Sequence, residues 1–341
     1  MPSSAGEALP FVAAAAVYDG FLYEGGKVAG SVQVKVAKMK NGEAKVTATV
    51  QMAGEAKKLS FKNGIADATG KVTSMSVAGH QLDITVGVNG LGGAFDGKTV
   101  DGARNVFSGK SAADKSAAEK AASRYQGVYN VAFDGGTLSV SVEKKGKAKV
   151  SGTVNGNKVS ATSQLVVGKD AAVVPAVITK KVNMAFCLWV RANGKVEVRG
   201  IEGAIADRPS TLKAGAKFGV GGAAGVRALP GLYGEYLPNG IVVAASGTKW
   251  VVAGGVKAGK VAFVKGGNTV DESKLGTNPS GLKLTYKQKD GTFKGSFKAY
   301  CLEGGKIRAY TASVTGVMIG AKGYGTATVK KLACAFPITV E

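Results

Sequence analysis

Apolar and polar residues alternate with a period of two in three separate stretches of this chain, residues 30–47, 136–152 and 281–297. Each stretch begins with glycine, runs through an alternating segment, reaches a lysine-flanked glycine turn and then alternates again. The turns are Asn41-Gly42, Lys145-Gly146 and Asp290-Gly291. Alternation sends successive side chains to opposite faces of a strand, and Asn-Gly or Asp-Gly between two such runs is typical of a type I′ hairpin. The pattern therefore predicts three copies of one β-hairpin.

Further similarities around these hairpins indicate larger repeated units. A tyrosine-glycine opening precedes each hairpin, beginning at Tyr18, Tyr125 and Tyr233, and glycine-punctuated strand pairs follow later in each stretch. Many short strands in units of this length are typical of small sandwiches or barrels. We therefore expect an all-β protein built from three tandem related β-sandwich- or barrel-like units, at residues 15–108, 125–220 and 228–341.

Two segments break the pattern and are expected to connect the units. In residues 109–124, which are rich in alanine, Ser111 and Asp114 have the spacing of a capping box, and Lys115 and Glu119 stand four residues apart. This segment is predicted to be a short connecting helix, with an apolar face made only of alanine. Residues 221–227 are predicted to be a flexible glycine-rich linker.

The composition adds a strong positive charge, because 45 Lys and Arg face 23 Asp and Glu, a formal net charge of +22. Such a chain favours anionic partners in general: acidic polysaccharide, a phosphate-bearing cell-envelope polymer or nucleic acid. Lysines scattered along alternating strands, such as Lys35, also keep outer faces soluble and sheet edges unpaired, so charge alone does not establish a binding patch. No run approaches the roughly 18 apolar residues that a membrane helix needs, and no helical span is expected.

The three cysteines, Cys187, Cys301 and Cys334, are too few and too widely spaced for a disulfide scaffold or a C-x-x-C metal site. Cys301 and Cys334 fall in one predicted unit and could form a disulfide, or all three could be buried thiols. With a single histidine, His80, a His-rich zinc site is excluded. No metal or cofactor is expected.

Catalytic residues are hard to find in this sequence. His80 is interpreted as a turn or strand-end residue, because no local signature accompanies it. Most candidate acid or base carboxylates stand beside glycine, as at Asp19, Asp96 and Asp101, where turn chemistry accounts for them. Whether the chain is catalytic stays open, and no catalytic residue is assigned.

Aromatic residues are the better candidates for ligand binding, because exposed rings stack on sugar faces and a basic surround suits acidic glycans. Trp189 lies in an apolar run and is expected in the core, whereas Trp250 is preceded by Lys249 and is expected at the surface. The recurring tyrosines could instead pack under a sheet, as in the tyrosine corner of sandwich domains. The candidate ligand-binding residues are Trp250, Lys249, Tyr233 and Tyr236.

The last third of the chain carries a resemblance. Residues 278–287 and 290–297, together with Val314-Thr-Gly316 and residues 323–329, are similar to β-rich tandem repeat domains near the C-terminal ends of large secreted bacterial proteins. The resemblance rests on the spacing of glycine, lysine and β-branched residues. That family has no assigned activity, so the resemblance implies only an extracellular or cell-surface location and an accessory role.

These observations favour a non-enzymatic secreted or cell-surface module that is adhesive or binds anionic glycan. A secreted hydrolase or lyase acting on polysaccharide or peptide, with its site in a groove between units, is the alternative. Nucleic acid is the least favoured partner, because no recognised binding motif accompanies the charge.

Overall fold

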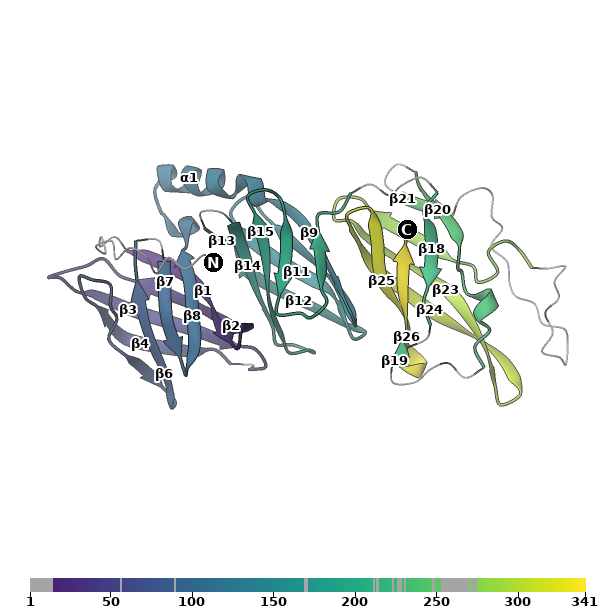
Figure 1. The fold of residues 1–341 in the computed structure, drawn as a ribbon, viewed down its shortest axis with the longest axis horizontal. Helices are drawn as coiled ribbons and strands as arrows, with labels where there is room; N and C mark the ends of the chain where they lie inside the picture. Colours follow the sequence, from purple (N-terminus) through teal and green to yellow (C-terminus); the bar gives the residue numbers. More distant parts are fainter. Residues whose placement is uncertain are drawn as a thin grey trace. The chain divides into compact units, whose positions relative to one another are not determined.

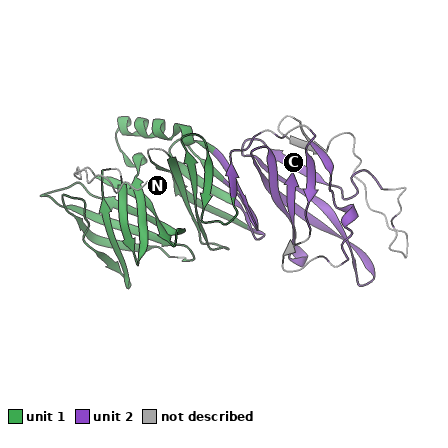
Figure 2. Cartoon of the chain, viewed as in Figure 1, with its two compact units in different colours: residues 1–127, 140–151, 158–204 green, residues 128–139, 152–157, 205–341 purple. Residues whose placement is uncertain are grey.

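The computed structural model describes residues 15–55, 57–88, 90–168, 171–210, 212, 215–222, 224–225, 229, 231–246, 249–252, 270 and 275–341. Strands make up 62% of the structure, which contains one short α-helix, and the predicted all-β class is confirmed. The chain divides into two compact units (Figure 2). Unit 1 comprises residues 1–127, 140–151 and 158–204, and unit 2 comprises residues 128–139, 152–157 and 205–341. The three predicted unit boundaries stay a prediction.

Unit 1 is built around an eight-stranded antiparallel sheet with the order β4-β3-β2-β1-β8-β7-β6-β5 (Figure 1). The two ends of this sheet approach each other: Ala66 and Val72 form a bridge, and Thr73 N donates to Ile65 O at 2.8 Å. The sheet therefore curls towards a barrel around one apolar core. Its strands are β1 (Ala16–Glu24), β2 (Lys27–Val36), β3 (Ala44–Met52), β4 (Leu59–Ala66), β5 (Met75–Val77), β6 (His80–Val86), β7 (Gly90–Phe95) and β8 (Lys98–Arg104).

Glycine allows β1 and β8 to pair closely. Gly20 and Gly102 stand opposite each other in this pair, and a Cβ added to Gly102 would lie 2.6 Å from Asp19 O. The turn interpretation of Asp19-Gly20 and Asp101-Gly102 is therefore wrong, because both pairs lie inside strands. Asp96-Gly97 does form a turn, with positive φ at both residues.

The three predicted hairpins differ in their turns. Asn41 and Gly42 have φ values of 53° and 81°, so the predicted type I′ turn is confirmed there. At Asp290-Gly291 only the glycine has positive φ, so the type I′ prediction is wrong there. At Lys145-Gly146, for which no turn type was predicted, again only the glycine has positive φ. At both glycines a side chain from outside the hairpin packs so closely that no Cβ fits, and sequence alternation does not show these contacts. A Cβ on Gly146 would meet the Phe107 ring at 2.2 Å, and one on Gly291 would meet Pro209 Cβ at 2.3 Å.

The connecting helix is confirmed as α1 (Ala112–Ala122), between the 3₁₀ turns η1 (Val106–Ser108) and η2 (Ser123–Tyr125). Both capping-box hydrogen bonds between Ser111 and Asp114 are present. Glu119 forms an ion pair with Lys144 at 2.9 Å, so its partner comes from outside the helix. Only alanines are buried on this helix, as expected.

Two smaller sheets follow the helix in the chain, and β10 to β12 contribute residues to both units. In unit 1 the four-stranded sheet packs on Phe21, Val28 and Ala103 through Cys187 and Trp189. Trp189 is only 1% exposed, so its predicted core position is confirmed. The five-stranded sheet has the order β12-β11-β10-β9-β17 and contains β9 (Gly127–Phe133), β10 (Gly136–Val142), β11 (Lys147–Val154), β12 (Asn157–Gln164) and β17 (Ile205–Asp207). The four-stranded sheet contains β13 (Val166–Val167), β14 (Ala171–Ile178), β15 (Met184–Arg191) and β16 (Val196–Arg199).

Unit 2 contains a second large antiparallel sheet, with the order β21-β20-β18-β26-β25-β24-β23-β22, around a core that includes Phe218, Phe297 and Phe336. The predicted linker 221–227 contains a short strand paired with β26, and only part of it lies among the described residues. The elements are β18 (Lys217–Val220), β19 (Ala224–Gly225), η3 (Gly234–Tyr236), β20 (Ile241–Ser246), β21 (Lys249–Val252), β22 (Lys283–Lys287), β23 (Thr292–Glu303), β24 (Lys306–Ile319), β25 (Lys322–Val329), η5 (Lys330–Leu332) and β26 (Cys334–Val340).

All three cysteines are buried thiols, and neither Cys301 nor Cys334 is in a disulfide. Of the two alternatives left open by the sequence, the structure therefore shows the buried thiols. Burial raises the pKa of the Cys187 thiol, which keeps it protonated at neutral pH.

Candidate binding surface

Two of the four predicted ligand-binding residues come together in unit 2. The rings of Tyr233 and Tyr236 lie 6.0 Å apart, and Tyr236 meets the Tyr300 ring edge-on at 6.5 Å. The backbone of Tyr233 joins this cluster to β23, since its N–H donates to Tyr300 O at 3.0 Å. We call Tyr233, Tyr236 and Tyr300 the tyrosine cluster.

The other two predicted residues are placed only by their backbone. Trp250 and Lys249 lie in β21, opposite Ala245 and Ser246 of β20. Their side chains lie outside the described part of the structure, so their role as surface residues stays a prediction. Tyr300 was missed by the sequence reasoning. Its signal was its phase in the alternating strand, two positions after Lys298 and six after Lys294.

The tyrosine cluster borders a polar sheet face, which we call the β22–β25 face. Directly opposed residues of paired strands share a face, and the register gives rows such as Lys283, Ser296, Ser313 and Thr328. The alternate positions point into the core, where Phe293 and Phe297 are each 2% exposed. The face consists of Lys283, Thr285, Lys287, Lys294, Ser296, Lys298, Thr311, Ser313, Thr315, Thr326 and Thr328.

The lysines of this face have few carboxylate partners. Lys287 pairs with Asp290 at 2.5 Å. No ion pair with a described carboxylate is formed by the other lysines of the face, Lys283, Lys294 and Lys298. Lys298 Nζ instead donates to Thr311 Oγ1 at 2.5 Å. The three ammonium groups are thus exposed on a face that also carries hydroxyl groups, and no described carboxylate neutralises their charge.

A groove of about 560 Å³ adjoins the face through the shared residues Thr311, Ser313 and Thr328. It lies where the long β23–β24 hairpin extends past the end of β25, since β24 pairs with β25 only from Ser313 to Ile319. The groove is lined by Arg308, Ala309, Tyr310, Thr311, Ser313, Thr328, Val329, Lys330 and Lys331.

One carboxylate, that of Glu303, contacts two residues that line this groove. Glu303 accepts a hydrogen bond from Tyr310 Oη at 2.6 Å and lies 3.5 Å from Arg308 Nε. The hydrogen bond to Glu303 raises the pKa of the Tyr310 hydroxyl, so this tyrosine stays a neutral donor. Lys330 and Lys331 form no ion pair with a described carboxylate, and the groove is lined by these two lysines and Arg308 but by no carboxylate.

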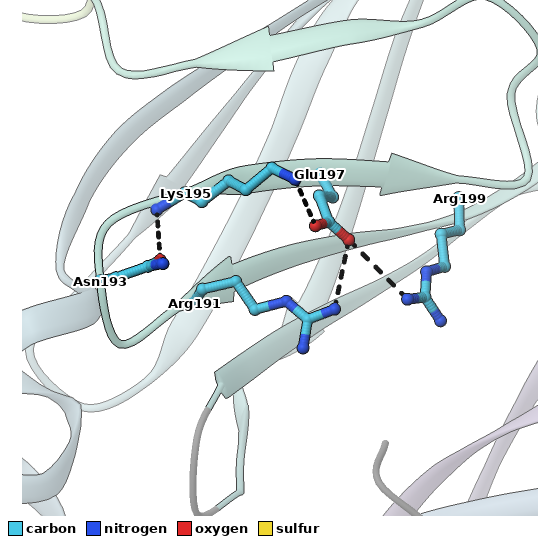
Figure 3. Close-up of polar contacts among 5 residues, drawn as sticks. All are labelled: Arg191, Asn193, Lys195, Glu197 and Arg199. Atoms are coloured by element: carbon cyan, nitrogen blue, oxygen red, sulfur yellow. Dashed lines mark hydrogen bonds and ion pairs between the residues drawn. The ribbon is translucent and has the colours of Figure 1, made fainter.

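One cluster of cations in unit 1 is already engaged with a carboxylate. In unit 1 Glu197 lies 3.3 Å from Arg191, 3.3 Å from Lys195 and 3.7 Å from Arg199 (Figure 3). The two guanidinium groups also stack on Trp189, with Arg199 Cζ 4.4 Å and Arg191 Cζ 5.4 Å from the ring centroid. Desolvation opposes the ionised form of Glu197, but hydrogen bonds from Lys195 and Arg191 outweigh it, and the pKa of this carboxyl is lowered. We interpret this cluster as a structural cover for the buried indole.

The residues considered for catalysis have structural partners. His80 opens β6, as predicted, and its Nδ1 lies 2.6 Å from Asp96 Oδ2 at an exposed hairpin end. Asp19 is 8% exposed and accepts hydrogen bonds from Gln33 at 2.9 Å and Asn105 at 2.6 Å. Burial raises the pKa of the Asp19 carboxyl, and those two hydrogen bonds oppose the rise. Neither carboxylate is brought beside a described nucleophilic side chain by these contacts.

No protein-family model matches the sequence, and no curated protein is significantly similar to it. Among the described helices, none is long and apolar enough to cross a membrane.

Proposed function

We propose that this chain is a non-enzymatic, secreted or cell-surface β-module that binds an anionic polysaccharide through the β22–β25 face and the adjoining groove. The observation that carries the proposal is the set of exposed lysines without carboxylate partners in a surface of threonine and serine hydroxyls. The secreted or surface location belongs to the same proposal and rests on the resemblance of the last third of the chain.

The side-chain chemistry favours polysaccharide over nucleic acid. Hydroxyl groups outnumber ammonium groups on this face, and hydroxyls pair with sugar hydroxyls while lysines pair with sulfate or carboxylate groups. Tyr233 and Tyr236, which are half-buried, add rings that can stack on sugars at one end of the face, whereas the third ring of the cluster, Tyr300, is buried.

The proposal includes three related β-modules in tandem. Two strand pairings support it, because the first strand of a predicted unit pairs antiparallel with a strand near the end of the same unit: β1 with β8 in residues 15–108, and β9 with β17 in residues 125–220. Each pairing brings the end of a predicted unit back to its beginning, as expected when one module is repeated.

The test is binding of immobilised dextran sulfate, with uncharged dextran as the matched polymer. We expect binding to dextran sulfate alone, weakening steadily with salt as bound counterions are released. The Lys294→Gln/Lys298→Gln variant should bind about tenfold more weakly, with a salt slope smaller by about two. A matched control, Lys180→Gln/Lys181→Gln, removes the same charge from the turn between β14 and β15 and should bind like the unmodified protein.

Equal weakening in both variants would mean that only net charge matters, and the proposed site would fall. Release of reducing ends from the polymer during the same incubation would contradict the non-enzymatic part of the proposal.

A further inference from the structure

A β-bulge interrupts the β3–β4 pair in unit 1. Val46 pairs with Gly64 and Ala48 pairs with Phe61, so Thr47 alone stands opposite two residues, Lys62 and Asn63. Asn63 has a φ of 63°, a left-handed conformation that asparagine tolerates better than most residues. Bulges bend a strand and redirect its side chains, and they are frequent beside functional sites.

The bulge lies in a groove of about 500 Å³ on the unit 1 sheet. Its exposed lining combines two lysines with three hydroxyl side chains, one amide and Ile65, which is 39% exposed. The lining residues are Lys45, Val46, Thr47, Ala48, Thr49, Ser60, Phe61, Lys62, Asn63, Gly64 and Ile65.

The charge around this groove is positive. Lys35 stands opposite Thr47 in the β2–β3 pair and adds a third ammonium group beside Lys45 and Lys62. None of the three lysines forms an ion pair with a described carboxylate. An occupant must therefore supply the negative charge, together with groups that pair with hydroxyls and the Asn63 amide.

Packing beneath the bulge fixes its shape. A Cβ on Gly64 would lie 2.5 Å from Met75 Sδ and 3.2 Å from Val46 Cβ. Glycine therefore lets Met75 of β5 pack directly under the bulge. The groove is thus held by the core of unit 1, and its lysines project from a supported backbone.

We propose that unit 1 holds a second, independent site for a sulfated or carboxylated polysaccharide segment, in the bulge groove between Lys45 and Lys62. This inference rests on the proposed function for its class of ligand, but on different residues. Lysines at the groove bind the anionic groups, while Thr47, Thr49, Ser60 and Asn63 bind sugar hydroxyls.

The experiment is isothermal titration calorimetry of the full chain with short dextran sulfate oligosaccharides, and with single-stranded polydeoxyadenylate as competitor. We expect two sites per chain. Lys45→Gln/Lys62→Gln should remove one site, Lys294→Gln/Lys298→Gln the other, and the fourfold variant both. Circular dichroism of each variant should match that of the unmodified protein, since all four side chains are exposed.

The outcomes separate the two proposals. One site, lost only in the Lys294/Lys298 variant, would overturn the second site and leave the proposed function standing. One site, lost only in the Lys45/Lys62 variant, would support the bulge groove and overturn the unit 2 face. Polydeoxyadenylate that displaces the oligosaccharide from the groove at equal concentration would contradict its assignment to polysaccharide.

Discussion

Each unit presents a lysine-, threonine- and serine-bearing sheet face, and the two faces differ in backbone regularity. In unit 2, the β22–β23, β23–β24 and β24–β25 pairs keep one register throughout, so rows of side chains run straight across the sheet. In unit 1, the register shifts at the β3–β4 bulge and a groove opens there. The same residue types thus form an extended platform when the ladder is regular and a localised groove when it is interrupted. We expect the platform to accept a long polymer and the groove a short segment.

The largest effect is expected when the bulge itself is altered. Gly64→Ala places a Cβ against Met75 and Val46 and should lower the free energy of unfolding of unit 1 by about 1.5 kcal/mol, because overpacking displaces the core beneath the strand. Differential scanning calorimetry measures this loss. Gly92→Ala in β7 of the same sheet is the control, since its Cβ would meet nothing within 4 Å.

If Gly64→Ala also reduces the number of oligosaccharide sites from two to one, binding in the groove depends on the backbone shape of the bulge. Two retained sites in a destabilised protein would show that the lysines act without the bulge, and the distinction between platform and groove would be lost.

Alternation correctly predicted strands and the first type I′ turn, and capping-box spacing predicted the helix, because those features depend on neighbouring residues. Alternation failed for features that depend on pairing between strands far apart in the sequence. Gly20 and Gly102 lie opposite each other across β1 and β8, 82 positions apart in number, and nothing local marks the pair. The extra residue at Asn63 is visible only once β4 is aligned with β3.

The candidate site was predictable to a similar extent. Tyr233 and Tyr236 could be chosen because aromatic rings in a basic chain suit an acidic glycan, although their recurrence also fitted a packing role. The phase of Tyr300 places it on the same strand face as Lys298, but only the antiparallel bridge between Leu232 and Cys301 shows that it meets the other two tyrosines. The lysine faces were foreseen as a general property, but the register was needed to show which lysines share a face.

The second-largest effect is expected on polymer binding in the groove beside the unit 2 platform. Lys330→Gln/Lys331→Gln removes two cations at the end of β25 and should weaken dextran sulfate binding at unit 2 by about fivefold, because both lysines line the groove. Calorimetry should show the unit 1 site unchanged. The Lys180→Gln/Lys181→Gln protein is again the charge-matched control, and an equal loss at both sites would show that the groove is not distinct from the general field of the protein.

A smaller effect is expected from the tyrosine cluster, which has no counterpart in the unit 1 groove. Tyr236→Ala removes the ring that meets Tyr300 edge-on, and should weaken polymer binding at unit 2 by about threefold through lost stacking. Tyr236→Phe keeps the ring and should bind almost normally. If Tyr236→Ala lowers the melting temperature but leaves the affinity intact, the tyrosines act only in packing, as in a tyrosine corner.

The smallest effect should tighten binding. Asp290 neutralises Lys287 at the edge of the platform, and it also accepts a hydrogen bond from Thr292 Oγ1 at 2.7 Å. Burial opposes ionisation of Asp290, but the hydrogen bonds from Lys287 and Thr292 outweigh it and lower the pKa of this carboxyl. Because its folded pKa lies below the unfolded value, Asp290 stabilises the fold above the unfolded pKa, and this contribution is lost as pH falls through the folded pKa. Asp290→Asn should therefore cost at most about 1 kcal/mol at neutral pH, with the difference from the unmodified protein vanishing in acid.

The same substitution releases Lys287 for the ligand, and dextran sulfate, which stays ionised in acid, should bind unit 2 about twofold more tightly at neutral pH. On acidification, the unmodified protein should gain this affinity as Asp290 is protonated, while Asp290→Asn should not. The unit 1 groove has no such carboxylate among its lining residues and should show neither change. A parallel gain at both sites would mean that binding follows net charge, and the two faces would then be one diffuse positive surface.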